Sequence, residues 1–190
     1  MYQRVIKRGL DILLCGAAML IIWPLFLLIA ILIKLDSKGP VYFKQKRVGI
    51  HKTHFYIYKF RTMRTDTPKD VPTHLLQDPD AFITRMGKFL RKTSLDELPQ
   101  IVNIIKGDLS IIGPRPVIEE ELEKYGENKE KFLSVTPGLT GYWQANGRSS
   151  TTYEQRMEME LYYIDHISPK LDFKIFFKTI ESVIKKEGAI

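Results

Sequence analysis

The sequence contains one cysteine and one long apolar run. Cys15 has no partner for a disulfide within the 190 residues, which fits a reducing, cytoplasm-facing chain. Because no second apolar run follows residues 12–33, the sequence argues against a polytopic transporter. There are no internal repeats and no low-complexity tract.

Motifs for three familiar kinds of site are also missing. The sequence has no Walker loop for nucleotide phosphates, no zinc-ligand spacing and no Gly-x-Ser-x-Gly turn for a serine nucleophile. Its four histidines form no evident ligand cluster; they are His51, His54, His74 and His166. The candidate chemical groups are therefore the carboxylates and the basic side chains.

The composition describes a folded, basic chain. Hydrophobic residues make up 44% and charged residues 27% of the sequence, which at this length is typical of one globular domain or two small ones. The 29 Lys and Arg residues exceed the 22 Asp and Glu residues, for a net charge of +7. Such an excess favours anionic partners, namely phospholipid, a phosphorylated ligand or nucleic acid.

The apolar run is the 22 uncharged residues from Ile12 to Ile33. As a helix it would be about 33 Å long, enough for a bilayer core of about 30 Å. Pro24 lies near its middle. Because proline removes a backbone donor and crowds the carbonyl of Leu20, we expect the helix to kink or break there.

Basic residues flank the apolar run on both sides. They are Arg4, Lys7 and Arg8 before it, and Lys34, Lys38, Lys44, Lys46 and Arg47 after it. Because the positive-inside rule keeps such flanks on the cytoplasmic side, a re-entrant hairpin satisfies both, whereas a spanning helix leaves one outside. Proline kinks also occur in spanning helices, so the residues alone leave both topologies open, with a buried soluble helix as a third alternative.

The rest of the sequence predicts an α+β domain that is mostly helical. Two aromatic and β-branched runs, Val41–Phe43 and Phe55–Phe60, predict a small β-hairpin through Gly49–Lys52. Helical patterns cover Ile83–Lys92, Leu98–Ile105 (stopped by Gly107), Ile118–Phe132, Tyr153–Tyr163 and Leu171–Lys186. Loop compositions cover Asp66–Asp80, Gly113–Pro116 and Thr136–Ser150. Ile83–Lys92 and Leu171–Lys186 are amphipathic, and the latter suits either a membrane interface or the protein's own core.

Asp96 and Glu97 are an adjacent acidic pair in a basic neighbourhood. Ser94-x-x-Glu97 matches the spacing of a capping box, and acids also favour the positive end of a helix. Alternatively, one carboxylate is a nucleophile and the other a metal or proton partner, as a covalent phosphoryl intermediate requires. Mg²⁺ suits such a pair, since it binds one or two carboxylates plus substrate phosphate oxygens. The spacing allows either role.

Arg115 lies between Pro114 and Pro116. Because prolines restrict the backbone, the guanidinium is held at low entropic cost and suits bidentate phosphate binding; a surface salt bridge is the alternative. Further donors occur in short polar motifs; they are Gln45, Arg47, Lys59, Arg61, Gln144 and Arg148. Together these residues predict a site for a multiply phosphorylated ligand.

Seven motifs occur in order along the whole chain. They are Lys7-Arg8-x-x-Asp11, Gln45-x-Arg47-x-Gly49, Tyr58–Met63, Ser94–Gln100, Lys106–Ser110, Gly113–Pro116 and Pro137–Gly141. With them the sequence resembles the bacterial sugar transferase family, the monotopic phosphoglycosyl transferases, in what looks like a minimal catalytic form.

The resemblance implies a reaction and a location. A sugar-1-phosphate would move from a UDP-sugar to polyprenyl phosphate, through a covalent intermediate on Asp96 and with release of UMP. Glu97, with Asp96, would hold Mg²⁺. Residues 1–36 would form a re-entrant membrane helix broken at Pro24, and residues 37–190 a compact catalytic domain on the cytoplasmic face of the bacterial inner membrane.

The sequence departs from the family pattern at three places. Trp23 precedes Pro24 where the family often has serine, Glu160 stands where an Asp is common, and His166 stands where an aromatic residue is often found. A longer carboxylate at Glu160 could still reach a metal or a basic partner.

Two other functions compete with the transferase. One is a membrane-anchored basic module that binds anionic lipid or nucleic acid, and the other is an anchored hydrolase of nucleotide sugars. The resemblance favours a UDP-sugar, polyprenyl phosphate and membrane lipids as partners and no nucleic acid. The sugar, the pathway and the oligomeric state stay open.

Overall fold

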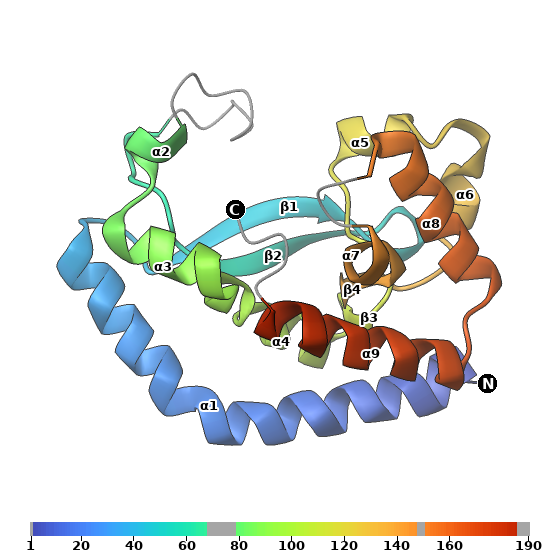
Figure 1. Cartoon of the computed structure of the whole chain (residues 1–190), viewed down its shortest axis with the longest axis horizontal. Coiled ribbons are helices and arrows are strands. Elements are labelled where there is room, and N and C mark those ends of the chain that lie inside the picture. Colours follow the sequence, from blue (N-terminus) through green and yellow to red (C-terminus); the bar gives the residue numbers. More distant parts are fainter. Residues whose placement is uncertain (1, 68–78, 148–150, 186–190) are drawn as a thin grey trace.

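A computed structural model of the chain describes residues 2–67, 79–147 and 151–185. It begins with a π-helical turn, η1 (Tyr2–Lys7), which continues into the long helix α1 (Arg8–Asp36). Pro24 lies inside α1, and Figure 1 shows the helix bent into two arms that curve around one side of the domain. The expected break is therefore a bend, because proline removes a single hydrogen bond and the turns on either side keep theirs.

Most of the apolar surface of α1 is exposed. Leu20, Ile21 and Trp23 are 79%, 77% and 59% exposed. Among the described residues, Val5–Asp36 is the one helical segment long and apolar enough to cross a membrane, by length and composition. Leaving apolar surface in water costs about 25 cal/mol of free energy for each Å². The exposed helix therefore indicates a membrane-associated protein.

The predicted hairpin is confirmed and is longer than expected. Strands β1 (Tyr42–Val48) and β2 (His54–Phe60) pair antiparallel and are joined through the 3-10 turn η2 (Ile50–Lys52). The register sets Gln45 opposite Ile57 and Arg47 opposite Phe55. Because side chains alternate along a strand, Gln45, Arg47 and Lys59 lie on the same face of the hairpin.

The two helices predicted around the acidic pair are also confirmed. Between the hairpin and the second sheet lie α2 (Pro79–Phe82), α3 (Arg85–Thr93), η4 (Leu95–Glu97) and α4 (Gln100–Lys106). The Thr84 hydroxyl caps α3 by accepting from the Gly87 N–H at 2.9 Å. Gly107 ends α4 with a left-handed φ of 99°, which is the stop that the sequence predicted.

The C-terminal half differs from the prediction in two places. Its elements are β3 (Ser110–Ile112), α5 (Glu119–Glu123), η5 (Gly126–Asn128), α6 (Lys129–Phe132), β4 (Gly138–Thr140), α7 (Tyr142–Asn146), α8 (Tyr153–Asp165) and α9 (Pro169–Ile184). The single helix expected over Ile118–Phe132 is interrupted at Gly126, which has φ of 52°. The expected loop Thr136–Ser150 contains β4 and α7, because β4 pairs in parallel with the distant β3.

Apolar contacts join α1 to the domain near both of its ends. Toward the C-terminal end, Ile29 and Ile33 pack with Phe60 and Leu90. Toward the N-terminal end, Cys15 packs against the hairpin and α4 in a cluster with Phe55, Ile57, Ile101, Ile104 and Leu109. Between Cys15 and Ile29, one side of the helix stays in contact, because Met19 and Ile22 pack against the first cluster and Leu25 and Phe26 against the second. The domain therefore covers one side of α1 and leaves the other side exposed.

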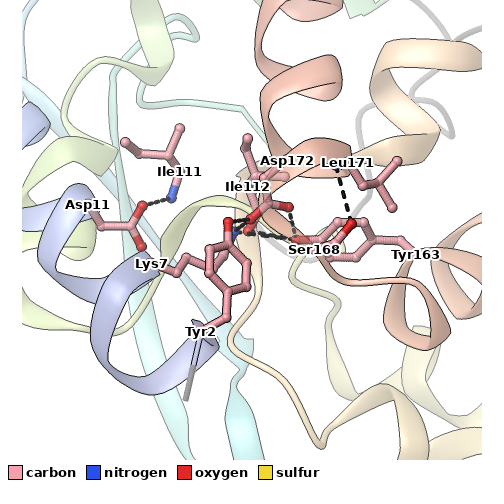
Figure 2. A network of polar contacts seen from close by, with 9 residues as sticks. All are labelled: Tyr2, Lys7, Asp11, Ile111, Ile112, Tyr163, Ser168, Leu171 and Asp172. Carbon is pink, nitrogen blue, oxygen red and sulfur yellow. Dashed lines mark hydrogen bonds and ion pairs between the residues drawn. The ribbon is translucent and has the colours of Figure 1, made fainter.

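Polar contacts reinforce the N-terminal attachment (Figure 2). Asp172 of α9 forms an ion pair with Lys7 and accepts from the hydroxyls of Tyr2 and Tyr163 at 2.6 and 2.7 Å. The Asp11 carboxylate accepts from the backbone N–H of Ile111 at 3.1 Å. The start of α1 is thus tied to α8, α9 and β3.

The C-terminal end of α1 has its own polar attachment. The Arg61 guanidinium donates to the carbonyls of Lys38 and Ser37 at 2.6 and 2.8 Å. The Asp36 carboxylate accepts from the backbone N–H of Met86 at 2.9 Å. Both ends of α1 are therefore fastened to the same domain.

Candidate active site

The acidic pair lies in one 3-10 turn, η4, between α3 and α4. Ser94 precedes this turn with a left-handed φ of 56° and serves as the C-cap of α3. Its side chain makes no capping hydrogen bond, so the capping-box interpretation is wrong. A capping serine needs extended backbone, whereas here the chain reverses at Ser94 to present Asp96 and Glu97.

Glu97 is held by a lysine from the hairpin. The Lys59 ammonium lies 2.5 Å from the Glu97 carboxylate. Burial alone would raise the pKa of Glu97, but the charges of Lys59 and Arg115 and the hydrogen bond from Lys59 outweigh it and hold that pKa below its ordinary value. Glu97 is therefore an anion throughout the neutral range.

Asp96 has the opposite shift. Burial raises its pKa to about 6, with Lys59 and Arg91 opposing and the neighbouring Glu97 adding to the rise. A carboxylate with a pKa near neutrality is what a nucleophile or a proton carrier needs. The two adjacent acids thus differ in chemistry because their surroundings differ.

Arg91 on α3 was not among the residues selected from the sequence. Its Nε donates to the Thr62 hydroxyl at 3.0 Å, and its charge helps to lower the pKa of Asp96. The basic face of the predicted helix Ile83–Lys92 held the signal, since Arg91 lies within two turns of the acidic pair.

A second cluster of predicted residues gathers beside the acidic pair. Arg47 donates to Gln45 Oε1 at 2.6 Å and to the Glu121 carboxylate at 3.3 Å. Burial lowers the pKa of Arg47, and the charge of Arg115 lowers it further. Arg115 also acts on the pKa of Glu97, so it links this arginine cluster to the acidic pair.

Aromatic rings complete the cluster with residues that the sequence did not single out. The guanidinium of Arg115 lies 5.8 Å, and that of Arg156 4.6 Å, from the centre of the Trp143 ring. Gln144 follows Trp143 on α7. Glu160 is buried and accepts from the Arg115 backbone N–H. Arg156 and Trp143 carried no signal of their own in the sequence.

Three positions from the sequence analysis lie apart from this group. Arg61 binds the carbonyls that follow α1, and its buried guanidinium lies with that segment. His166 is exposed at the end of α8 and stacks on Tyr162. Arg148 is outside the described residues.

The acidic pair has the donor chemistry for a magnesium ion. Among the described residues no group of three or more His, Cys, Asp or Glu side chains could enclose a metal. Mg²⁺ needs fewer protein ligands, because substrate phosphates and water complete its octahedral shell. Asp96 and Glu97 fit that pattern, with Lys59 keeping one of the two anionic.

Comparison with known proteins identifies the family. The model of the bacterial sugar transferase family matches residues 2–186. The chain is 39% identical to the exopolysaccharide production protein ExoY of Rhizobium meliloti, over 96% of this chain and 87% of ExoY. It is 36% identical to the undecaprenyl-phosphate galactose phosphotransferase of Salmonella typhimurium, over 98% of this chain and 42% of the relative.

A further relative transfers a different sugar according to its name. It is the UDP-N-acetylgalactosamine-undecaprenyl-phosphate N-acetylgalactosaminephosphotransferase of Aeromonas hydrophila, which is 40% identical over 97% of this chain and 45% of the relative. The chain thus spans less than half of the two named phosphotransferases and most of ExoY. From the family match along nearly its whole length, the chain belongs to the bacterial sugar transferase family.

Proposed function

We propose that the protein transfers a sugar-1-phosphate from a UDP-sugar to polyprenyl phosphate and releases UMP. The observation that carries the proposal is the acidic pair Asp96–Glu97, set between Lys59, Arg91 and Arg115. A site that only bound anions would gain nothing from two carboxylates, whereas phosphoryl transfer uses them together with cations. The names of the Salmonella and Aeromonas relatives support the same reaction class.

The proposed reaction has two steps, each a displacement at the same phosphorus. A carboxylate oxygen of Asp96 attacks the sugar-bearing phosphorus, and the bond from that phosphorus to the bridging oxygen of the diphosphate breaks, so that UMP leaves with the electron pair. A phosphate oxygen of the lipid then attacks the same phosphorus. The acyl-phosphate bond breaks, which restores the Asp96 carboxylate and yields a polyprenyl diphosphate sugar.

The basic residues stabilise the charge that moves during both steps. Lys59 fixes Glu97 at 2.5 Å and lies beside the phosphoryl group that Asp96 receives. Arg115, which belongs to the arginine cluster beside the acidic pair, binds the phosphates of the donor. Asp96 and Glu97 would hold Mg²⁺, which supplies positive charge to the phosphate oxygens when bound.

We further propose that α1 enters the membrane and returns to the same face. Both of its ends are attached to one domain through Asp172, Arg61 and Asp36. A spanning helix would need that domain on both sides of the bilayer. The 29 residues of α1 reach about 43 Å, and the bend is convex on the side away from the domain (Figure 1).

In this arrangement residues 1–36 form the membrane part and residues 37–190 the catalytic domain. The domain lies on the cytoplasmic face of the bacterial inner membrane, where nucleotide sugars are made. Helix α9 supports the same orientation, because Phe173, Phe177 and Ile180 on its outer face are 66%, 52% and 40% exposed and suit the interface.

The test is a transfer assay on the full chain in detergent or vesicles. UDP-galactose, UDP-N-acetylgalactosamine, UDP-glucose and UDP-N-acetylglucosamine are each incubated with undecaprenyl phosphate and Mg²⁺. We expect UMP with at least one donor and a phosphosugar adduct on the peptide that contains Asp96. Absence of UMP with every donor would favour a non-catalytic anion-binding module, and full-rate UMP release without lipid would favour a hydrolase.

A further inference from the structure

We propose that Glu160 is a positioning residue for the donor diphosphate: it holds Arg115 and Arg156 beside Trp143, so that both guanidiniums bind one nucleotide diphosphate. The inference rests on the proposed function and extends it to a carboxylate that has no part in the chemical steps. The sequence alone left open whether Glu160 meets a metal or a basic partner.

The first observation is how Glu160 contacts the Pro-Arg-Pro loop. Glu160 lies on α8 and is 1% exposed. Its two carboxylate oxygens both accept from the backbone N–H of Arg115, at 3.1 and 3.0 Å. A buried carboxylate without partners is costly, so this contact fixes the backbone of Arg115 to α8 across 45 residues of sequence.

The second observation is the place of Arg156 one helical turn before Glu160. Arg156 Nε lies 4.0 Å from the Glu160 carboxylate, and its guanidinium lies 4.6 Å from the centre of the Trp143 ring and 5.4 Å from that of Tyr153. Glu160 therefore holds one arginine through its backbone and the other through its charge.

The third observation is an excess of positive charge. Arg47, Arg115 and Arg156 lie close enough that the charges of the last two lower the pKa of Arg47, after the larger effect of burial. The carboxylates in contact with this group are Glu121 and Glu160. Within the described residues, no carboxylate pairs with the Arg115 guanidinium, and Arg156 Nε and Nη2 have no hydrogen-bond partner.

A diphosphate matches what this cluster is missing. Buried guanidinium donors without acceptors lower stability, and a diphosphate supplies both charge and several acceptors to planar donor groups. The cluster adjoins the acidic pair through Arg115. A donor bound with its diphosphate on Arg115 and Arg156 would therefore present a phosphorus to Asp96.

The charge state of Glu160 gives the proposal a pH signature. The groups facing it are Arg115 from the loop after β3, Arg156 and Tyr153 on α8, and Tyr125 after α5. Burial raises the pKa of Glu160 to about 7, against the hydrogen bond from Arg115 and the two cations. Burial also raises the pKa of both tyrosines, which stay neutral. Donor affinity should therefore fall as the pH drops through about 7.

The main experiment measures kcat and KM for the UDP-sugar across the neutral pH range. For Glu160→Gln we expect KM to rise about tenfold, as for loss of a charge-assisted contact, with kcat changed less than about twofold. The rise of the wild-type KM below pH 7 should disappear in this variant. Glu160→Asp keeps the charge and should keep that pH response. Glu158→Gln, on the exposed side of the same helix, is the matched control and should behave as the wild type.

A binding measurement makes the outcome independent of turnover. The chain has two tryptophans, so in a Trp23→Phe background the fluorescence reports on Trp143. Titration with UDP should quench it, and Glu160→Gln or Arg156→Lys should shift the midpoint about tenfold upward. Inorganic pyrophosphate should show the same order of variants, because the contact is to the diphosphate.

The outcomes separate the inference from the function on which it rests. A folded Glu160→Gln with wild-type KM, pH response and UDP titration would overturn the positioning role. If that variant does not fold, Arg156→Lys decides, and a wild-type KM and titration would then overturn the proposal. A wild-type protein that releases no UMP but shows the expected titrations would refute the transferase and support the anion subsite.

Discussion

Helix α1 exposes apolar side chains, whereas the arginine cluster buries charged ones; both depart from the usual distribution in a folded protein. Leu20 on α1 is 79% exposed, whereas Glu160 in the cluster is 1% exposed. In water, the exposed apolar side chains of α1 forgo the free energy gained by burial, and the buried carboxylate of Glu160 loses its hydration. Each is reasonable only with its own environment, a bilayer for α1 and a bound anion for the cluster. Under the proposed function, the two regions meet at the boundary between the lipid bilayer and a charged substrate.

The largest effect is expected for Asp96→Asn, which removes the proposed nucleophile from the charged region. We expect transfer to fall by at least about a thousandfold, since the amide cannot form the acyl phosphate. Because the change is isosteric, circular dichroism and vesicle sedimentation should be unchanged. The control is Asp165→Asn, an exposed position on α8, and near-normal turnover of Asp96→Asn would remove the assignment.

Lys59→Met should have the next largest effect. Lys59 lowers the pKa of both Glu97 and Asp96, so its loss raises both and leaves the acids protonated at higher pH. We expect about a hundredfold lower rate near pH 7 and an acid limb that moves to higher pH.

The measurement is the rate as a function of pH and Mg²⁺ concentration, with a higher Mg²⁺ requirement expected for the variant. Lys44→Met on the same hairpin is the control, because Lys44 is exposed and lies over Tyr58. An unchanged pH profile in Lys59→Met would contradict the role of the ion pair with Glu97.

A smaller effect is expected where the two regions meet, at the polar attachment in Figure 2. Lys7→Met breaks the ion pair with Asp172, which keeps its hydrogen bonds from Tyr2 and Tyr163. We expect a loss of about 2 kcal/mol in the free energy of unfolding, against about 1 kcal/mol for Tyr2→Phe.

Thermal unfolding and limited proteolysis of residues 2–11 measure this attachment. Cleavage should become faster in Lys7→Met while the rest of the domain stays protected. Equal stability of Lys7→Met and Tyr2→Phe would show that the ion pair contributes no more to the attachment than the hydrogen bond from Tyr2.

The smallest effect is expected for Pro24→Ala. Alanine restores the hydrogen bond to the Leu20 carbonyl and favours a straighter helix, but both ends of α1 remain attached. Tags at either end should be accessible only from the cytoplasmic side in the variant and in the wild type, and activity should change less than about twofold. If one end of the wild type can be labelled from outside the cell, α1 spans the membrane and the re-entrant topology is wrong.

Local signals in the sequence predicted the elements around the acidic pair. The hairpin follows from two aromatic runs, and Gly107 marks the end of α4 because its left-handed φ suits glycine. Gly126 carried a similar signal inside Ile118–Phe132, but the charged, helix-forming residues around it outweighed it. The pairing of β3 with β4 was beyond prediction, since parallel strands pair across a distance that leaves no local pattern.

The candidate site likewise contains residues that the sequence predicted, whereas one predicted residue lies elsewhere. Asp96, Glu97, Lys59 and Arg115 were predicted from motifs, and the structure brings them together. Arg61 belonged to an equally clear motif, but it binds the carbonyls after α1. A motif specifies which donors are present, and only packing specifies what each donor reaches.

By itself the sequence determined the apolar helix, its proline, its basic flanks and the types of side chain that form the site, because each is a property of composition and spacing. The tertiary structure decided the rest. It attached both ends of α1 to one domain, gave the two neighbouring acids opposite pKa shifts, and placed the Glu160 carboxylate on the Arg115 backbone. These depend on burial and on contacts between distant segments, which arise only once the chain is packed.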